Sequence, residues 1–258
     1  ALNPPPEADP MEDTSVNTFT IRGLDITAPT NKAVYSMRTT ETDGLFWYSA
    51  EAGSTVAELF YSHDDFATSN RIMFSGLPQT GNNDSGNNIN EKDWVIPGTL
   101  MPSTNGEVKV VVINLESITD PFTLRGIRIT QPVKGDVFDI GATESVLWES
   151  AGLKSSANSS NALSTTGQGG PFEYVGVGDA GSDTAFILNN GFNWAIDTDI
   201  DPTTNAVIRL AIYTPTQDTD VVMYSDPFTL RGLKVLSPAT GTNWELGASV
   251  NVSFVAAG

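Results

Sequence analysis

Three aspartates at alternate positions are the strongest candidate for site chemistry in this chain. Asp197, Asp199 and Asp201 stand in the stretch Asp-Thr-Asp-Ile-Asp. On an extended backbone alternate side chains share one face, so the three carboxylates would repel one another. A hard cation such as Ca²⁺ prefers carboxylate oxygens and would relieve this repulsion, which makes Ca²⁺ the cofactor that the spacing suggests. The alternative is a turn before Pro202 with solvated aspartates that accept backbone hydrogen bonds, because the glycine and distal glutamate of an EF-hand loop are missing.

Residues for the common catalytic sets are missing. The chain has one histidine, His63, and no cysteine. No Ser-His-Asp set can therefore recur from copy to copy, and no multi-histidine zinc site can form. Residues 176–181 match the glycine spacing of a dinucleotide-binding turn, but 182–188 is too short for the helix that such a site needs. We therefore expect a protein that is not an enzyme.

The element that must position the aspartates is a repeat of roughly 100 residues, a length typical of one domain. Its clearest mark is a Phe-Thr-Ile/Leu-Arg-Gly segment that occurs at 19–23, 122–126 and 228–232. Each copy continues into an apolar alternation that ends in a proline, at Pro29, Pro132 and Pro238. The chain is therefore an array of similar domains.

The repeated segments are short, rich in β-branched and aromatic residues, and bounded by turn formers, which is typical of strands. No long window shows helical periodicity. We predict an all-β chain of tandem immunoglobulin-like β-sandwich domains in an extended array. The repeat divides the chain into an N-terminal segment with the final strand of a preceding or trans-completed domain, two full domains, and the first strands of a further domain, at 1–22, 23–125, 126–231 and 232–258.

The junctions between copies have almost no linker. Phe122 and Leu124 would face one core, and Ile127 would begin the next, because side chains alternate along a strand. A glycine between them lets the backbone change sheets, and so short a connection predicts a stiff rod. The predicted junction residues are Arg22 and Gly23, Arg125 and Gly126, and Arg231 and Gly232.

The junction arginine recurs in a chain that has few cations. It predicts either a structural salt bridge or backbone clamp at the domain boundary, or a contact with an acidic neighbouring subunit. The first is favoured because an acidic chain offers carboxylates within the same domain.

The charge balance excludes two classes of partner. The chain has 31 acidic and 13 basic residues and a net charge of −18. Such a surface repels nucleic-acid phosphates and anionic membranes, and no segment is long and apolar enough to span a bilayer. We expect no nucleic-acid partner and no membrane insertion. The lack of cysteine with abundant Ser, Thr, Asn and Gly is typical of an exported prokaryotic protein, located outside the cell or at its surface.

Two polar stretches, 76–90 and 153–170, are predicted loops. Long loops on a rigid sandwich often carry binding function, and the alternative is a tolerated insertion in each domain. Four tryptophans recur at matched positions and are predicted to fill the sandwich cores rather than to bind sugars: Trp47, Trp94, Trp148 and Trp194.

The segments resemble the immunoglobulin-like domains found in tandem in large bacterial surface proteins, and they are similar to the Kre9/KNH-like domain group. Ser237-Pro238 with Gly241, Trp244 and Gly247 fits the opening of that pattern. Trp148 fits its second strand, and 94–97 and 225–230 fit a later strand and the close. The first full repeat departs from the pattern, because 33–44 lacks the Gly-x-x-Trp-x-x-Gly stretch. The resemblance implies β-sandwich domains that act as spacers, adhesive modules, or surface-layer or filament subunits.

These observations favour an extracellular structural protein, a subunit or stalk of a prokaryotic filament, sheath or surface layer. Its partner would be further copies of the chain, joined head to tail as a homo-oligomer or polymer. The incomplete copies at the two ends indicate either a piece of a longer array or assembly in trans, in which the open third copy takes a strand from the next subunit. The alternative function is a cell-surface adhesin or carbohydrate-binding module that binds a glycan through the loops 76–90 and 153–170.

Overall fold

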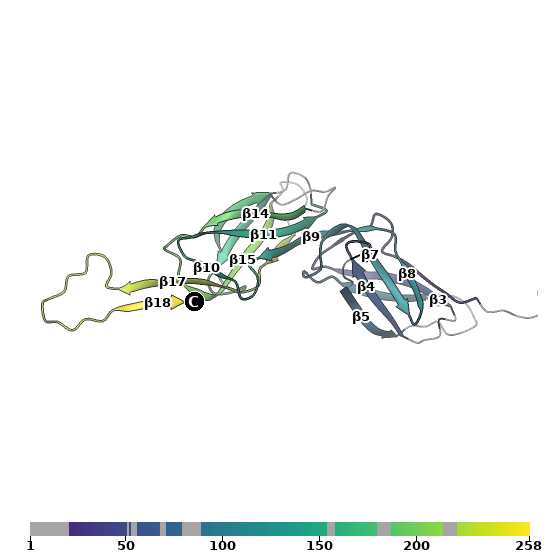
Figure 1. The fold of residues 1–258 in the computed structure, drawn as a ribbon, viewed down its shortest axis with the longest axis horizontal. Coiled ribbons are helices and arrows are strands. Elements are labelled where there is room, and N and C mark those ends of the chain that lie inside the picture. Colours follow the sequence, from purple (N-terminus) through teal and green to yellow (C-terminus); the bar gives the residue numbers. More distant parts are fainter. Residues whose placement is uncertain are drawn as a thin grey trace, which may run out of the picture.

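The chain folds into β-strands. A computed structural model describes residues 21–50, 52, 56–67, 71–78, 89–153, 158–179, 187–213 and 221–258. Within these ranges there is no helix, and the strands form two β-sandwiches followed by a two-stranded hairpin (Figure 1). The predicted all-β fold of tandem immunoglobulin-like sandwiches is confirmed. Most of the segment 1–22 lies outside the described residues.

The first sandwich has two facing sheets. One has the order β1-β3-β6 and the other β9-β7-β4-β5, with β2 parallel to β9 and β8 paired with β7. Its strands are β1 (Gly23–Ala28), β2 (Val34–Ser36), β3 (Thr40–Ala50), β4 (Val56–Ser62), β5 (Arg71–Pro78), β6 (Ile89–Val95), β7 (Ser103–Val112), β8 (Leu115–Ile118) and the first half of β9 (Phe122–Gln131).

The second sandwich repeats this plan. The second half of β9 begins the sheet β9-β11-β14, and the other sheet has the order β10-β17-β15-β12-β13 with β16 on β15. Its further strands are β10 (Val137–Asp139), β11 (Thr143–Ala151), β12 (Asn158–Ser164), β13 (Glu173–Asp179), β14 (Ile187–Ala195), β15 (Thr203–Tyr213), β16 (Val222–Tyr224) and the first half of β17 (Phe228–Ser237).

Side-chain alternation explains why these segments form half-buried strands. In β7, Gly106, Val108 and Val110 are buried and alternate with the partly exposed Glu107 and Lys109. One face of the strand therefore packs in the core while the other faces outward.

The four recurring tryptophans lie in the two cores, as predicted. All four are buried. In the first sandwich, Trp94 packs edge-on to Phe122, with ring centroids 6.0 Å apart. In the second, Trp148 lies 6.4 Å from Phe192.

The prediction that 153–170 is one loop is wrong. Residues 158–164 form β12, which pairs with both β13 and β15. β12 is a buried strand in spite of its polar composition, because Asn161 finds partners both within β12 and on the neighbouring strand β13. Asn161 Nδ2 donates to Ser159 Oγ at 3.1 Å and to the carbonyl of Gly176 at 3.3 Å. Of the other predicted loop, 76–78 belongs to β5 and 89–90 to β6, and 79–88 lies outside the described residues.

The part of the third copy that the structure describes forms one hairpin. β17 continues past the second sandwich and pairs with β18 (Ser253–Ala257). Its register matches that of the first hairpin of each sandwich, with the junction glycine opposite an alanine: Gly23 with Ala50, Gly126 with Ala151, and Gly232 with Ala257. The hairpin thus has the structure of the opening hairpin of a third sandwich. Among the described residues no helix is long and apolar enough to cross a membrane.

Truncation of a buried tryptophan tests the assignment of the core. Trp148→Ala leaves a cavity, so we expect the free energy of unfolding of the second sandwich to fall by about 3–5 kcal/mol. Tyr174→Ala removes an aromatic ring from the same sandwich that is 64% exposed, and it should cost less than about 0.5 kcal/mol. Urea unfolding followed by circular dichroism measures both, and equal losses would contradict the assignment.

Candidate functional site

At two of the three junction glycines, Gly126 and Gly232, the backbone passes close to another side chain. A Cβ on Gly126 would lie 2.7 Å from Cγ of Met37, and a Cβ on Gly232 would lie 3.0 Å from Cδ1 of Ile140. Met37 and Ile140 occupy the same position in the repeat, just after β2 and β10. The glycine therefore lets the strand that leaves a sandwich pass against an apolar side chain of the same sandwich.

Arg125 and Arg231 each bond a residue at the end of the short parallel strand beside them. Arg125 is in register with Ser36, and its Nε donates to Ser36 Oγ at 3.2 Å. Arg231 is in register with Asp139, and its Nε and Nη2 donate to the two carboxylate oxygens at 2.6 and 2.8 Å. The arginine therefore connects the last strand of a sandwich to β2 or β10 of the same sandwich.

Backbone hydrogen bonds repeat around the arginine. The N–H of Met37 donates to the carbonyl of Arg125 at 2.9 Å, and the N–H of Ile140 donates to that of Arg231 at 3.0 Å. The junction thus combines a ladder bond, a side-chain bond and a close glycine contact in each sandwich.

The first junction has only part of this arrangement among the described residues. Arg22 Nη2 donates to the carbonyl of Ala52 at 3.4 Å. A Cβ on Gly23 would meet nothing within 4 Å. Gly23 therefore has no described counterpart of Met37 or Ile140.

The two sandwiches also touch beside β9. The Arg38 guanidinium of the first sandwich lies over the Tyr224 ring of the second, 5.7 Å from its centroid. A Cβ on Gly98 would lie 2.6 Å from Nε of Arg38 and 3.0 Å from Cε of Met223. These contacts supplement the shared strand and oppose bending at the junction.

The predicted cation-site residues lie in the turn between β14 and β15. Asp197 Oδ1 accepts the backbone N–H of Asp199 at 3.0 Å. Lys234 of β17 donates its Nζ to the Asp199 carbonyl at 2.5 Å and to Asp201 Oδ1 at 2.7 Å. Within the described ranges, no group of three or more His, Cys, Asp or Glu side chains could hold a metal ion. The Lys234 ammonium group neutralises part of the negative charge of this acidic turn.

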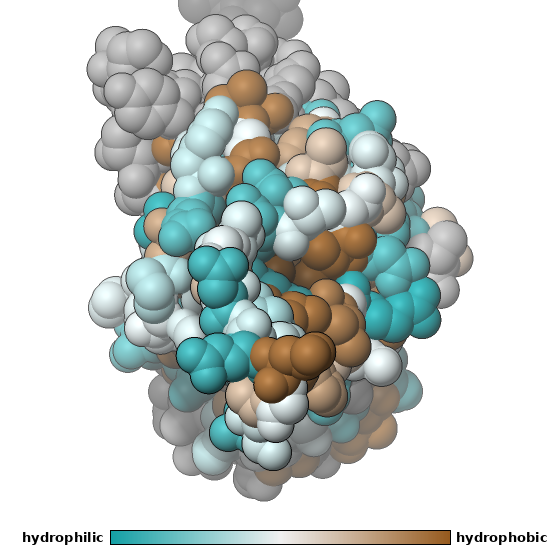
Figure 2. All heavy atoms as spheres, turned by 90° about the vertical axis from the view of Figure 1, so that its left-hand side faces the viewer, coloured by the Kyte–Doolittle hydropathy of each residue, from teal (hydrophilic) through white to brown (hydrophobic). Residues whose placement is uncertain are grey.

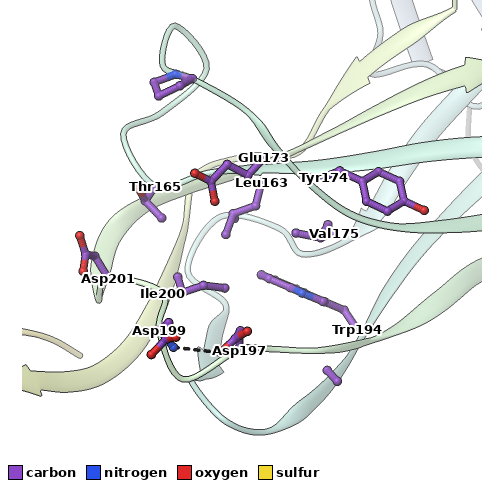
Figure 3. Close-up of a pocket in the computed structure, with 12 residues that line it drawn as sticks. Leu163, Thr165, Glu173, Tyr174, Val175, Trp194, Asp197, Asp199, Ile200 and Asp201 are labelled. Carbon is purple, nitrogen blue, oxygen red and sulfur yellow. Dashed lines mark hydrogen bonds between the residues drawn. The ribbon is translucent and has the colours of Figure 1, made fainter.

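The acidic turn borders a hollow on the second sandwich. The hollow has a volume of about 480 Å³ and includes Trp194, Glu173 and Tyr174 in its lining along with the three aspartates. Figure 3 shows the carboxylates of Glu173, Asp199 and Asp201 on one side and the Tyr174 ring apart from them on the other. This arrangement could bind a polar or cationic ligand against an aromatic ring. Sequence reasoning identified the aspartates but not Glu173 or Lys234, whose role depends on strand neighbours distant in the chain.

Comparisons with known proteins give no family. No family model matches the chain, and no curated protein does so either. Among solved structures, the chain is similar to the fibronectin(III)-like modules of Clostridium thermocellum CbhA, with 12% identity, a TM-score of 0.22, and 80% of this chain and 91% of that chain covered. It is also similar to Rst D1-D2, with 11% identity, a TM-score of 0.25, and 79% and 97% covered. These TM-scores are too low to place the chain in either group.

The ion pair at the Arg231–Gly232 junction has a measurable pKa signature. The hydrogen bonds from Arg231 hold the pKa of Asp139 below its ordinary value, because they stabilise the charged carboxylate. A depressed folded-state pKa stabilises the fold above the unfolded pKa of about 3.9, and this contribution is lost as pH falls through the folded pKa. NMR titration should therefore give a low Asp139 pKa that rises in Arg231→Gln. Arg128→Gln, which removes an arginine paired with Glu149, should leave the Asp139 pKa unchanged. An unchanged value in Arg231→Gln would contradict the pairing.

The cation site predicted at Asp197, Asp199 and Asp201 can be tested against Lys234. Ca²⁺ bound there would compete with the ammonium group for the Asp199 carbonyl and Asp201. We therefore expect Lys234→Ala to show a larger rise in melting temperature with Ca²⁺ than the wild type, because ligand binding to the native state stabilises it. Calorimetry with and without Ca²⁺ measures this rise. If Ca²⁺ changes the melting temperature of neither protein, the predicted cation site is wrong.

Proposed function

We propose that this chain is a non-catalytic extracellular structural protein, a subunit or stalk of a prokaryotic filament, sheath or surface layer. The observation that carries the proposal is β9, a single strand that belongs to two sandwiches. Phe122 and Leu124 are buried in the first, and Ile127 is buried where β9 pairs with β11 in the second. Bending at this point would break backbone ladders on one side or the other.

The side contacts support a stiff element. Across the boundary, Arg38 lies over the Tyr224 ring and Gly98 packs closely against Met223. An array of such units transmits force along its axis, which is what a stalk or filament subunit must do.

The composition supports an exported location. The net charge of −18 and the lack of cysteine give a soluble acidic surface without disulfides. Divalent cations could cross-link such surfaces, and the acidic turn at 197–201 is the first place to look for them.

A second candidate function is adhesion or carbohydrate binding. The hollow beside Trp194 favours it, since Tyr174 is exposed and several carboxylates that could bond sugar hydroxyls lie nearby. In this candidate function the binding surface includes residues of β12 and β13, rather than the whole of the predicted loop 153–170.

Electron microscopy of the isolated protein, before and after EDTA, tests the structural role. We expect ordered filaments or sheets in the absence of EDTA, and loss of order with EDTA if cations cross-link the subunits. Separate short rods under both conditions would contradict self-assembly and favour the adhesin.

A further inference from the structure

The terminal hairpin exposes the face that both complete sandwiches bury. Leu233 is 65% exposed and Phe254 is 61% exposed, whereas their equivalents Ile127 and Trp148 are fully buried. Figure 2, the view onto this end of the molecule, shows apolar side chains gathered there. The other large apolar residues exposed on the hairpin and its connection are Val235, Leu236, Trp244, Leu246, Val250 and Val252. An apolar face of this kind is typical of an interaction surface.

The connection between β17 and β18 already has the turns of a complete sandwich. The N–H of Ala248 donates to the Glu245 carbonyl at 3.1 Å, as that of Ala142 donates to the Asp139 carbonyl at 3.0 Å. Residues 243–245 therefore stand where β10 stands in the second sandwich. What is missing beside them, among the described residues, is the parallel strand that β9 and β17 supply elsewhere.

The other end of the described chain has the complementary exposure. Ile21 is 73% exposed, although its equivalents Leu124 and Leu230 are completely buried. The space beside Gly23 is open, whereas Gly126 and Gly232 contact Met37 and Ile140. Leu246, the equivalent of Met37 and Ile140, is likewise exposed.

We propose that the backbone at Ile21 and Arg22 of a second copy of this chain supplies the missing parallel strand beside residues 243–245. This interface rests on the proposed head-to-tail assembly and specifies how it is made. The register follows from the two complete sandwiches, where Leu124 lies opposite Tyr35 and Leu230 opposite Phe138. Ile21 therefore lies opposite Trp244.

The same register places opposite charges together. Arg22 lies opposite Glu245, as Arg231 lies opposite Asp139. The carbonyl of Arg22 accepts the N–H of Leu246, as that of Arg231 accepts the N–H of Ile140. Leu246 covers the open side of Gly23. Apolar burial, a charge pair and backbone hydrogen bonds therefore all favour the Ile21–Arg22 segment of a second copy as the occupant.

The strand comes from another molecule because the two elements lie far apart in one copy. The hairpin β17–β18 extends from the outer end of the second sandwich, whereas β3, which pairs with β1, lies in the first sandwich at the other end (Figure 1). A heterologous contact of this kind repeats in one direction and produces a linear assembly.

Glycine substitution separates docking from folding. Gly23→Leu enters open space in the single chain, but it would collide with Leu246 in the interface. Gly169→Leu is the matched control, because Gly169 also has nothing within 4 Å of a Cβ. Sedimentation velocity over a range of concentrations should show association of the wild type and of the control, and a loss of at least about tenfold in the association constant for Gly23→Leu.

Charge exchange tests the register. Arg22→Glu and Glu245→Arg should each weaken association, because each places like charges together, and the double variant Arg22→Glu/Glu245→Arg should regain it. Glu91→Arg, on the outer face of β6, controls for net charge. Failure of the double variant to recover would overturn the Arg22–Glu245 pairing.

The outcomes separate this interface from the proposed function. Filaments or sheets that persist in Gly23→Leu would overturn the interface and leave the structural role intact, with the third sandwich completed by other residues. A wild-type chain that stays monomeric and forms no ordered assembly would contradict both.

Discussion

Both complete sandwiches depend on a strand that each shares with its neighbour. β9 closes the first sandwich through its pairing with β7 and opens the second through its pairing with β11. The strand can serve both only if its backbone crosses between sheets within a few residues. Gly126 makes this crossing compatible with Met37, whose side chain fills the space that a Cβ would occupy. The junction is therefore part of two hydrophobic cores, and neither sandwich is complete without it.

The repeat in the sequence was sufficient to predict the fold and the buried tryptophans, because the same apolar pattern occurs in each copy. The repeat was less informative at positions where the copies share a backbone conformation but have different residues. Lys32 and Arg38 have φ of 62° and 64°, and they stand where the second copy has Gly135 and Gly141, with φ of 96° and 85°. The first repeat therefore has the same turns although it lacks the glycines. At Arg38, a hydrogen bond from its N–H to the carbonyl of Ile96 at 2.8 Å and the contact with Tyr224 offset the cost of the left-handed backbone.

The candidate site was predictable in its charges but not in its neighbours. The spacing of Asp197, Asp199 and Asp201 is visible in the sequence, and their proximity to Lys234 depends on β17 passing the turn between β14 and β15. The same limit applies to β12, where a run of Ser and Asn looks like a loop until β13 and β15 are placed beside it. Local composition cannot show which polar groups will find partners across a sheet.

The arginine at the junction is better understood as a register device than as a source of stability. Arg231 and Asp139 are about half exposed, and exposed ion pairs of this kind contribute little to the free energy of folding because water screens them. Apolar burial supplies more, and it excludes a slip of one residue, which would turn Leu230 away from the core. A slip of two residues would keep Leu230 on the core side, so a directional bond at the neighbouring position selects the correct pairing. Because Ser36 and Asp139 both serve this purpose, the geometry of the bond matters more than its charge.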